Sequence, residues 1–208
     1  RWLTSIGAGA MIRPGDDVGY LGAIYTLQKY AGISAHPGAK TALSLSGQSH
    51  YLEMNASRVT VFGAAKEALP AWFKQHDWGV KIDYHTTSML PPDGDLIDYP
   101  VGDFIVKISG SARAIMECLY LADEEASFIE CYELMEGLNN LVPQKVESLL
   151  RQCTSVKVKR LFLYFAERAD HAWFRHIKTE ALDLGRGKRS LVKNGVYIPK
   201  YQITVPKM

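Results

Sequence analysis

The residues whose type and spacing indicate a chemical role are lysines and arginines, which are concentrated toward the C-terminus. Residues 155–208 hold 12 Lys or Arg and 4 Asp or Glu, a net of +8, whereas the preceding 154 residues carry a net of −6. The overall formal charge of +2 hides this division. Because a nucleic-acid backbone is a dense row of negative charges, it is the partner that such a surface predicts. A solvated basic surface with no partner would have the same composition.

A helix expected over 155–169 would order some of these cations. Its apolar residues recur at helical spacing and predict a buried stripe, and a second stripe at intervals of three, four and four predicts a basic face. The apolar stripe consists of Val158, Leu161, Phe162 and Phe165, and the basic one of Lys157, Arg160, Tyr164 and Arg168. Such a helix suits a position between a core and a polyanion, although a simply exposed helix has the same pattern.

The turn that follows adds further cations. Gly185 and Gly187 allow a close approach of the backbone. We expect the turn at 185–188 to fold back towards the basic face of the helix and to form one continuous patch with it. The predicted patch comprises Lys157, Arg160, Arg186, Lys188 and Arg189, with Lys193 close by in the sequence.

Two sequence motifs resemble those of cofactor-binding sites, but each lacks a residue that the motif requires. Gly7-Ala8-Gly9 begins like a dinucleotide fingerprint but lacks the third glycine, and Pro14-Gly15 ends the element where a helix should open. Gly187-Lys188 is followed by Arg189, whereas a phosphate-binding P-loop needs Ser or Thr there. We therefore predict no bound cofactor.

Metal and nucleophile chemistry find little support in the sequence. His171 and His176 are five residues apart, which does not place two ligands on one helix face, and zinc spacing is absent. Ser46 and His50 offer a hydroxyl and an imidazole without a third catalytic member. We therefore predict no metal site and no catalytic residue.

The alternative function is an enzyme, a metal-dependent nuclease or nucleotidyltransferase that acts on nucleic acid. Its metal-binding carboxylates would be Asp93 and Asp95, with Asp83 on a nearby strand. The Pro-Pro-Asp-Gly-Asp segment at 91–95 reads more simply as a turn. A scaffold that binds another protein through acidic helices is a third alternative. The acidic residues of the middle region, interpreted as solvated or partner-facing, are Glu117, Asp123, Glu124, Glu125, Glu130, Glu133 and Glu136.

Composition is that of an ordinary globular protein. The chain has 208 residues, 47% hydrophobic and 22% charged, and no apolar run approaches the roughly 20 residues of a membrane span. Cys118, Cys131 and Cys153 are odd in number and widely spaced, which favours reduced thiols and a cytosolic location. The start at Arg1, without an initiator Met, indicates the interior of a longer protein.

The expected fold class is α+β, with a sheet-rich first half and a helical second half. The chain should open with a hairpin over 2–13 that closes at Pro14-Gly15, and Asp16 or Asp17 should cap the first helix. It should end in a hairpin of 192–197 and 201–205 that turns at Asn194-Gly195. Further helices are expected at 39–45, from 69, from 109 or 111, and at 127–136, 143–153 and 155–169; strands are expected at 58–62, 80–85 and 104–108.

A series of motifs resembles one family along essentially the whole chain. Residues 2–13, WLTSIGAGAMIR, resemble the wing that ends the winged helix-turn-helix of AbiEi-type antitoxins of type IV toxin–antitoxin (abortive infection) systems. Matches follow in collinear order: Gly22-Ala23-Ile24-Tyr25, Gly38-Ala39-Lys40-Thr41-Ala42-Leu43, Leu69-Pro70-Ala71-Trp72-Phe73, Asp77-Trp78-Gly79, Arg113-Ala114-Ile115 with Glu117, Leu134-Met135-Glu136-Gly137-Leu138, residues 156–162 and residues 201–206.

The resemblance implies a cytoplasmic bacterial regulator and not an enzyme. Family members repress their own operon by binding inverted repeats, and they oppose a nucleotidyltransferase-like toxin without a stable complex. It also implies that residues 1–15 are the remnant of an N-terminal winged-helix domain, whose reading helices would precede Arg1, and that 16–208 form the antitoxin C-terminal domain. The DNA-binding residues predicted from the wing and the cationic end are Arg1, Arg13, Lys157, Arg160, Arg186, Lys188, Arg189 and Lys193.

Overall fold

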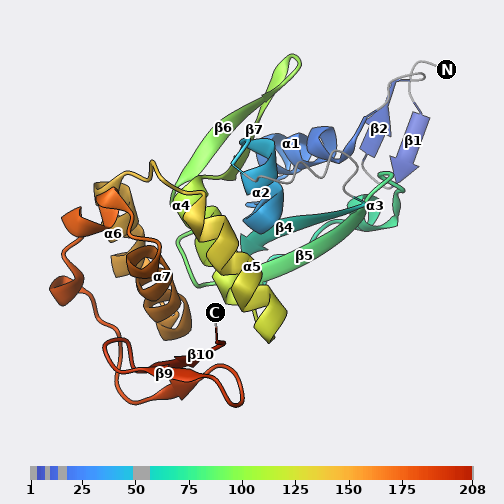
Figure 1. The fold of residues 1–208 in the computed structure, drawn as a ribbon. Coiled ribbons are helices and arrows are strands. Elements are labelled where there is room, and N and C mark those ends of the chain that lie inside the picture. Colours follow the sequence, from blue (N-terminus) through green and yellow to red (C-terminus); the bar gives the residue numbers. More distant parts are fainter. Residues whose placement is uncertain (1–3, 8–9, 14–17, 49–56, 208) are drawn as a thin grey trace.

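A hairpin and a helix begin the chain in the computed structural model, which describes residues 4–7, 10–13, 18–48 and 57–207 (Figure 1). Strands β1 (Thr4–Gly7) and β2 (Ala10–Ile12) pair antiparallel, so the predicted hairpin is confirmed. Helix α1 (Tyr20–Tyr30) has Gly19 at its N-cap. The expected closure at Pro14-Gly15 and the expected caps Asp16 and Asp17 lie outside the described residues.

A three-stranded sheet of order β3–β4–β5 follows. The two long strands run parallel and in register, while β3 pairs antiparallel with β4. The elements of this region are β3 (His36–Pro37), α2 (Ala39–Leu45), β4 (Arg58–Ala64), α3 (Ala71–Gln75) and β5 (Lys81–Thr87). The sequence patterns predicted all of these except β3, whose two residues are too few to form a recognisable alternation.

A separate antiparallel hairpin of β6 (Leu96–Val101) and β7 (Phe104–Ser109) projects from the body of the molecule (Figure 1). The side-chain amide of Gln28, on α1, occupies the edge of β7 that faces away from β6. Its Nε2 donates to the Lys107 carbonyl at 2.9 Å, and its Oε1 accepts from the Lys107 N–H at 2.9 Å. One side chain therefore supplies the two hydrogen bonds that a neighbouring strand would supply there.

Four helices form most of the second half. Helix α4 is buried on all sides from residue 112 to 119, because α2, α5, α6 and α7 pack around it. The four are α4 (Ser111–Leu121), α5 (Glu125–Glu136), α6 (Pro143–Gln152) and α7 (Val156–Arg168), and the short 3-10 turns η1 (Ala172–His176) and η2 (Thr179–Ala181) follow. The expected helical second half and the α+β fold class are confirmed.

A small sheet of order β8–β10–β9 ends the chain. Strand β9 (Val196–Ile198) pairs antiparallel with β10 (Ile203–Val205), and β8 (Arg189–Ser190) pairs parallel with β10. The predicted hairpin is thus present, but its turn lies at 199–202 and the prediction of Asn194-Gly195 is wrong. Gly195 serves another purpose, because a Cβ there would lie 2.2 Å from the Val205 carbonyl oxygen.

The core consists of two clusters of buried hydrophobic side chains. One surrounds α1, α3, β4 and β7, and the other surrounds α2, α4 to α7 and the last sheet. Cys118, Cys131 and Cys153 are buried and unpaired, in agreement with the expectation of free thiols. Within the described residues, no helix is long and apolar enough to cross a membrane.

Glu117 lies at the junction between the two halves of the fold. The sequence pattern placed it on a solvated acidic surface, and that prediction is wrong, because its side chain is fully buried. The other members of that acidic set, from Asp123 to Glu136, are exposed as expected. A single buried member within an acidic series indicates a structural ion cluster, since a buried carboxylate needs partners.

Candidate nucleic-acid interface

Helix α7 carries the predicted apolar stripe but not the predicted outward basic face. Ser155 caps the helix by accepting a hydrogen bond from the Val158 N–H at 3.3 Å. The apolar stripe faces the core as expected; its members Val158, Leu161, Phe162 and Phe165 are fully buried. The expectation that Lys157 and Arg160 lie on one exposed face is wrong, because Arg160 is buried and the half-buried Lys157 binds different partners.

Arg160 is 1% exposed, and its guanidinium donates hydrogen bonds to backbone carbonyls. Its Nε donates to the Leu184 carbonyl at 2.8 Å, and its Nη1 donates to the carbonyls of Gly187 at 2.7 Å and Gln202 at 3.1 Å. Burial, and then the nearby charge of Arg189, lowers the pKa of Arg160. The residue therefore lies beneath the C-terminal turn, and it is not a surface cation.

Lys157 is half-buried and turns towards α4 and α5. Its ammonium donates to the Tyr120 carbonyl at 3.0 Å and to the Ala122 carbonyl, and it lies 5.7 Å from the centre of the Phe128 ring. Burial lowers the pKa of Lys157. The amine thus caps the carboxyl end of α4, where a cation is favourable, and the continuous patch proposed from helical spacing does not include it.

The turn at 185–188 folds back onto α7, as predicted. Gly185 and Gly187 adopt left-handed backbone conformations, with φ of 67° and 80°. Four cations on and beyond this turn are exposed, and none forms a salt bridge to any carboxylate in the part of the chain that is described. These cations, named here the C-terminal cationic surface, are Arg186, Lys188, Arg189 and Lys193.

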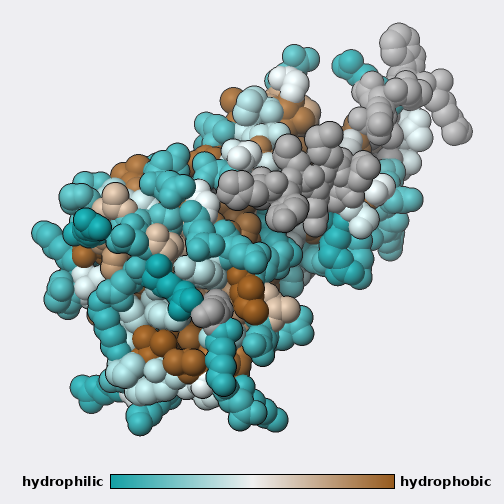
Figure 2. Space-filling model, viewed as in Figure 1, coloured by the Kyte–Doolittle hydropathy of each residue, from teal (hydrophilic) through white to brown (hydrophobic). Residues whose placement is uncertain are grey.

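Tyr197 on β9 belongs beside this surface, and sequence reasoning missed it. The Lys188 ammonium lies 5.1 Å from the centre of its ring, and the neighbouring Val196 is exposed. In Figure 2, hydrophilic side chains stand out around a small hydrophobic area at the end of the molecule that β9 and β10 form. The pairing could not be read from the sequence, because β10 lies between the two residues and joins them only through the register of the sheet.

The N-terminal hairpin is the other predicted contact with DNA. Arg13 is exposed immediately after β2, whereas Arg1 lies outside the described residues. Helix α3 contacts β1 and joins the hairpin to the body of the molecule. Figure 1 shows this hairpin and the sheet of β8 to β10 at opposite ends of the molecule, so Arg13 and the C-terminal cationic surface are separate sites. The DNA-binding role of both sets stays a prediction.

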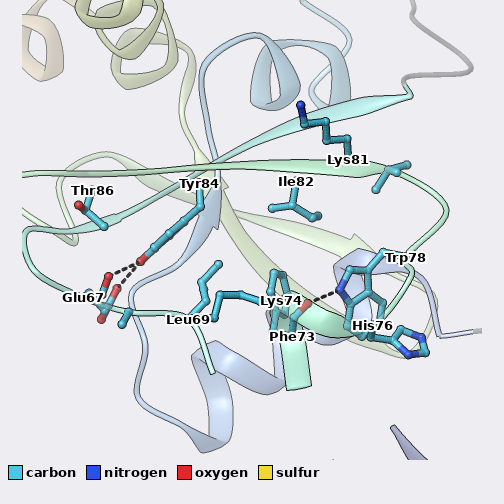
Figure 3. A pocket seen from close by; sticks show the side chains of 12 residues that line it. Glu67, Leu69, Phe73, Lys74, His76, Trp78, Lys81, Ile82, Tyr84 and Thr86 are labelled. Carbon is cyan, nitrogen blue, oxygen red and sulfur yellow. Dashed lines mark hydrogen bonds between the residues drawn. The ribbon is translucent and has the colours of Figure 1, made fainter. Parts of the chain in front are cut away.

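A hollow of about 650 Å³ lies between β5 and α3 (Figure 3). Ile82 and Tyr84 of β5 line one side, and Leu69 and Phe73 line the other. Trp78 closes one end, where its indole N–H donates to the Phe73 carbonyl at 2.8 Å. The lining therefore combines apolar side chains with polar ones, among which are Lys74, Lys81 and Thr86.

Two polar groups of this hollow, on Glu67 and Tyr84, have hydrogen-bond partners within the fold. The Glu67 carboxylate accepts hydrogen bonds from the N–H and the hydroxyl of Ser34, at 2.9 and 2.7 Å. The Tyr84 hydroxyl donates to the Glu67 carbonyl at 3.3 Å, and burial, followed by the charge of Glu67, raises the pKa of Tyr84 to about 12. Both side chains therefore help to hold the scaffold around the hollow.

The carboxylates of the alternative enzyme hypothesis have structural roles. Asp83 forms a salt bridge with Arg58 at 2.7 Å. Asp95 accepts from the Arg113 N–H at 3.4 Å near the start of α4, and burial raises the pKa of Asp95. Asp93 lies in a turn, as the sequence indicated. Among the described residues, no group of three His, Cys, Asp or Glu side chains could hold a metal ion.

The two histidines considered as metal ligands, His171 and His176, have different surroundings in the structure. His171 is buried, its Nε2 lies 2.7 Å from the Met135 carbonyl oxygen, and its ring stacks on Trp173. His176 is exposed at the end of η1. Ser46 donates back to the Ala42 carbonyl at 2.8 Å, and its expected neighbour His50 lies outside the described residues.

Comparison with known proteins follows the same collinear course as the motifs. Residues 1–54 match the family model described as transcriptional regulator, AbiEi antitoxin N-terminal domain. Residues 56–206 match the model described as transcriptional regulator, AbiEi antitoxin, type IV TA system. The class of protein that these matches define is a transcriptional regulator. Because the second match alone covers most of the chain, the chain belongs to the AbiEi antitoxin family of type IV toxin–antitoxin systems.

A solved structure with the same fold is the crystal structure of the RV2827C protein from Mycobacterium tuberculosis. The TM-score is 0.59 at 14% identity, and the alignment covers 98% of this chain and 75% of that chain. At this identity the likeness shows a shared fold. A search of curated proteins found no match. The predicted domain boundary at 15/16 stays a prediction, and the two family models meet at residues 54–56.

Proposed function

We propose that this chain acts as a cytoplasmic, non-enzymatic antitoxin that represses its own operon by binding inverted repeats in the operator DNA and counters a nucleotidyltransferase-like toxin. Membership of the AbiEi family supports both parts of this proposal. The observation that carries the DNA contact is the C-terminal cationic surface, where Arg186, Lys188 and Arg189 are exposed without acidic partners in the described structure. Such cations remain available to phosphate oxygens.

The hairpin supplies the second part of the DNA contact in this proposal. A wing presents its tip and edges to the DNA backbone or to the minor groove, and Arg13 follows β2 on the exposed side of such a hairpin. The operator-reading contacts then lie at the hairpin end, while the C-terminal cationic surface adds affinity without sequence preference.

A titration of this chain with a labelled duplex, followed by fluorescence anisotropy, tests the DNA contact. We expect weak binding at low salt that falls steeply as salt rises, because each phosphate contact releases counterions. Binding that ignores salt, or no binding at low salt, contradicts the proposal.

Growth of cells that express the cognate toxin tests the antitoxin role. Co-expression of the antitoxin should restore growth, although the two proteins should not co-purify, since we propose antagonism without a stable complex. An exposed-surface variant, Glu133→Gln, serves as the control for expression, because Glu133 lies outside both cationic sites.

A further inference from the structure

We propose that Arg160 is a positioning residue for nucleic-acid binding: it never meets the phosphate, and it sets the conformation of the C-terminal turn that carries Arg186, Lys188 and Arg189. The inference rests on the proposed function, because it takes the C-terminal cationic surface to be a DNA contact. It assigns the buried arginine a role different from the direct contact predicted from helical spacing.

The guanidinium of Arg160 connects three separate segments of chain. It donates to the Leu184 carbonyl before the turn, to the Gly187 carbonyl within it, and to the Gln202 carbonyl between β9 and β10. A guanidinium presents its N–H groups in a rigid planar fork, whereas a lysine ammonium is a point donor on a flexible stem. Arginine is therefore the side chain that can hold these carbonyls in one fixed arrangement.

A shared acceptor connects Arg160 directly to the strand that bears the cations. The Gln202 carbonyl accepts from Arg160 Nη1 at 3.1 Å and from the Arg189 N–H at 2.9 Å. Arg189 begins β8, and Lys188 lies between it and Gly187, whose carbonyl Arg160 also binds. The backbone on both sides of Lys188 is thus fixed by one buried side chain.

The turn depends on Arg160 for the partners of its Leu184 and Gly187 carbonyls, while its Gly185 N–H donates separately to the Asp183 carboxylate at 2.8 Å. The turn is exposed, and its two glycines adopt left-handed conformations that give a chain much freedom when it is not held. Gly185 is pressed against α7, because a Cβ there would lie 2.8 Å from Val156. Loss of the Arg160 hydrogen bonds would leave the Leu184 and Gly187 carbonyls without their partner, and the turn would move away to hydrate them.

The positive charge of Arg160 should also favour the binding of phosphate at the turn. Within the described residues no carboxylate forms a salt bridge with it, and its three acceptors are neutral carbonyls. A turn that is already held in its binding conformation, above a buried positive charge, loses less conformational entropy when it binds phosphate. In this proposal the hydrogen-bond geometry of Arg160 contributes more to DNA binding than its charge does. A variant that keeps the charge and changes the geometry separates these two contributions.

The test uses Arg160→Lys, which retains the charge and removes the planar fork. We measure duplex binding by anisotropy at low and moderate salt, for this variant alone and combined with Lys188→Ala. We expect Arg160→Lys to weaken binding about tenfold, the size of a lost hydrogen bond to a charged group. In the Arg160→Lys background, Lys188→Ala should have little further effect, because Lys188 is no longer held in position. The matched control is Arg175→Lys, whose exposed guanidinium pairs with Asp170, and it should bind like the wild type.

Gly187→Ala supplies a second route that leaves the core intact. A Cβ at Gly187 meets no neighbouring atom, but the left-handed conformation with φ of 80° strains any other residue, so the carbonyl should shift away from Arg160. The same loss of coupling with Lys188 is expected, and this variant decides the question if Arg160→Lys does not fold. The inference is overturned if both substitutions leave binding and coupling unchanged while Lys188→Ala weakens binding. If the wild type itself does not bind duplex DNA, the proposed function has failed first.

Discussion

The Nε2 atom of His36 lies 3.4 Å from the Oε1 atom of Glu117, and both side chains are fully buried. The two residues come from the two segments that separate family models match, so one buried contact joins the N-terminal match to the C-terminal one. Glu117 also accepts hydrogen bonds from the Ala39 N–H at 2.9 Å, the Ser109 hydroxyl at 2.8 Å and Arg113 Nε at 2.8 Å. The boundary between the matches is therefore not a boundary between independent cores.

Replacement of Glu117 by Gln should destabilise the protein by about 3–5 kcal/mol, the usual cost of breaking a buried ion pair by removing one partner. The Arg113 guanidinium would keep its bonds to the Pro91 and Gly94 carbonyls and lose its counter-charge. Urea unfolding at pH 7 measures the change. The exposed Glu133→Gln should stay within about 0.5 kcal/mol of the wild type, and an equal effect of both variants would contradict the assigned network.

The same carboxylate should make stability depend on acid pH. Burial alone would raise the pKa of Glu117, but the hydrogen bond and charge of His36, with Arg113, outweigh burial and leave the pKa lowered. A lowered pKa in the folded state contributes stability that is complete above the ordinary Glu value and is lost as pH falls through the lowered one. Unfolding free energies between neutral and acid pH should therefore fall less steeply for Glu117→Gln than for the wild type. Parallel curves would contradict this.

The three thiols should be unreactive in the native protein. Burial raises the pKa of Cys131 to about 12 and that of Cys118 well above its ordinary value, and Cys153 is buried and shifted in the same direction. Because the thiolate is the reactive species, iodoacetamide at pH 8 should modify the folded chain slowly and the urea-unfolded chain rapidly. Mass spectrometry counts the adducts, and fast labelling of any one cysteine in the folded state would show that it is accessible.

Gly195→Ala should destabilise the C-terminal sheet. The added Cβ would lie 2.2 Å from the Val205 carbonyl oxygen, which is backbone and cannot rotate away, so β10 must shift. We expect a loss of about 1–3 kcal/mol, typical of overpacking. Thermal unfolding measures it. Gly19→Ala is a suitable comparison, since a Cβ at Gly19 meets nothing within 4 Å and its φ of −66° is open to any residue.

The two cationic sites should protect different stretches of DNA. The β1–β2 hairpin, which Arg13 follows, and the sheet that Lys188 precedes lie at opposite ends of the molecule (Figure 1), so Arg13→Ala and Lys188→Glu should each weaken protection of a different stretch of the operator. Hydroxyl-radical footprinting of the operator reads both changes separately. Loss of the same protected positions in both variants would mean that one surface, and not two, contacts the DNA.

Much of the fold could be predicted from local patterns. The spacing of Val158, Leu161 and Phe165 predicted α7, because periodic burial is a local property of a helix. The short strands β3 and β8 escaped prediction, because two residues hold no period. The prediction of the hairpin turn at Asn194-Gly195 was wrong for a physical reason. Gly195 is required because it lies in close contact with β10, and the hairpin turn lies at 199–202, where Gln202 adopts a positive φ.

The candidate site was harder to predict, because charge alone does not show which way a side chain points. Arg160 and Glu117 both belong to runs of charged residues, and each is buried where several chain segments bring polar atoms to one point. Helical spacing placed Arg160 on the solvent side, whereas the carbonyls of Leu184, Gly187 and Gln202 form its binding place only after the chain has folded. The family resemblance, in contrast, depended on collinear motifs and was confirmed.

The amide of Gln28 has a consequence for self-association. An open strand edge can recruit a strand from another molecule, and the projecting β6–β7 hairpin would offer such an edge at Lys107. Gln28 occupies both backbone groups there and holds the Ala35 carbonyl as well, at 2.8 Å. Because Gln28 is a neutral side chain, neither salt nor pH should release these hydrogen bonds, and the edge at Lys107 should stay closed to a strand from another molecule under both conditions.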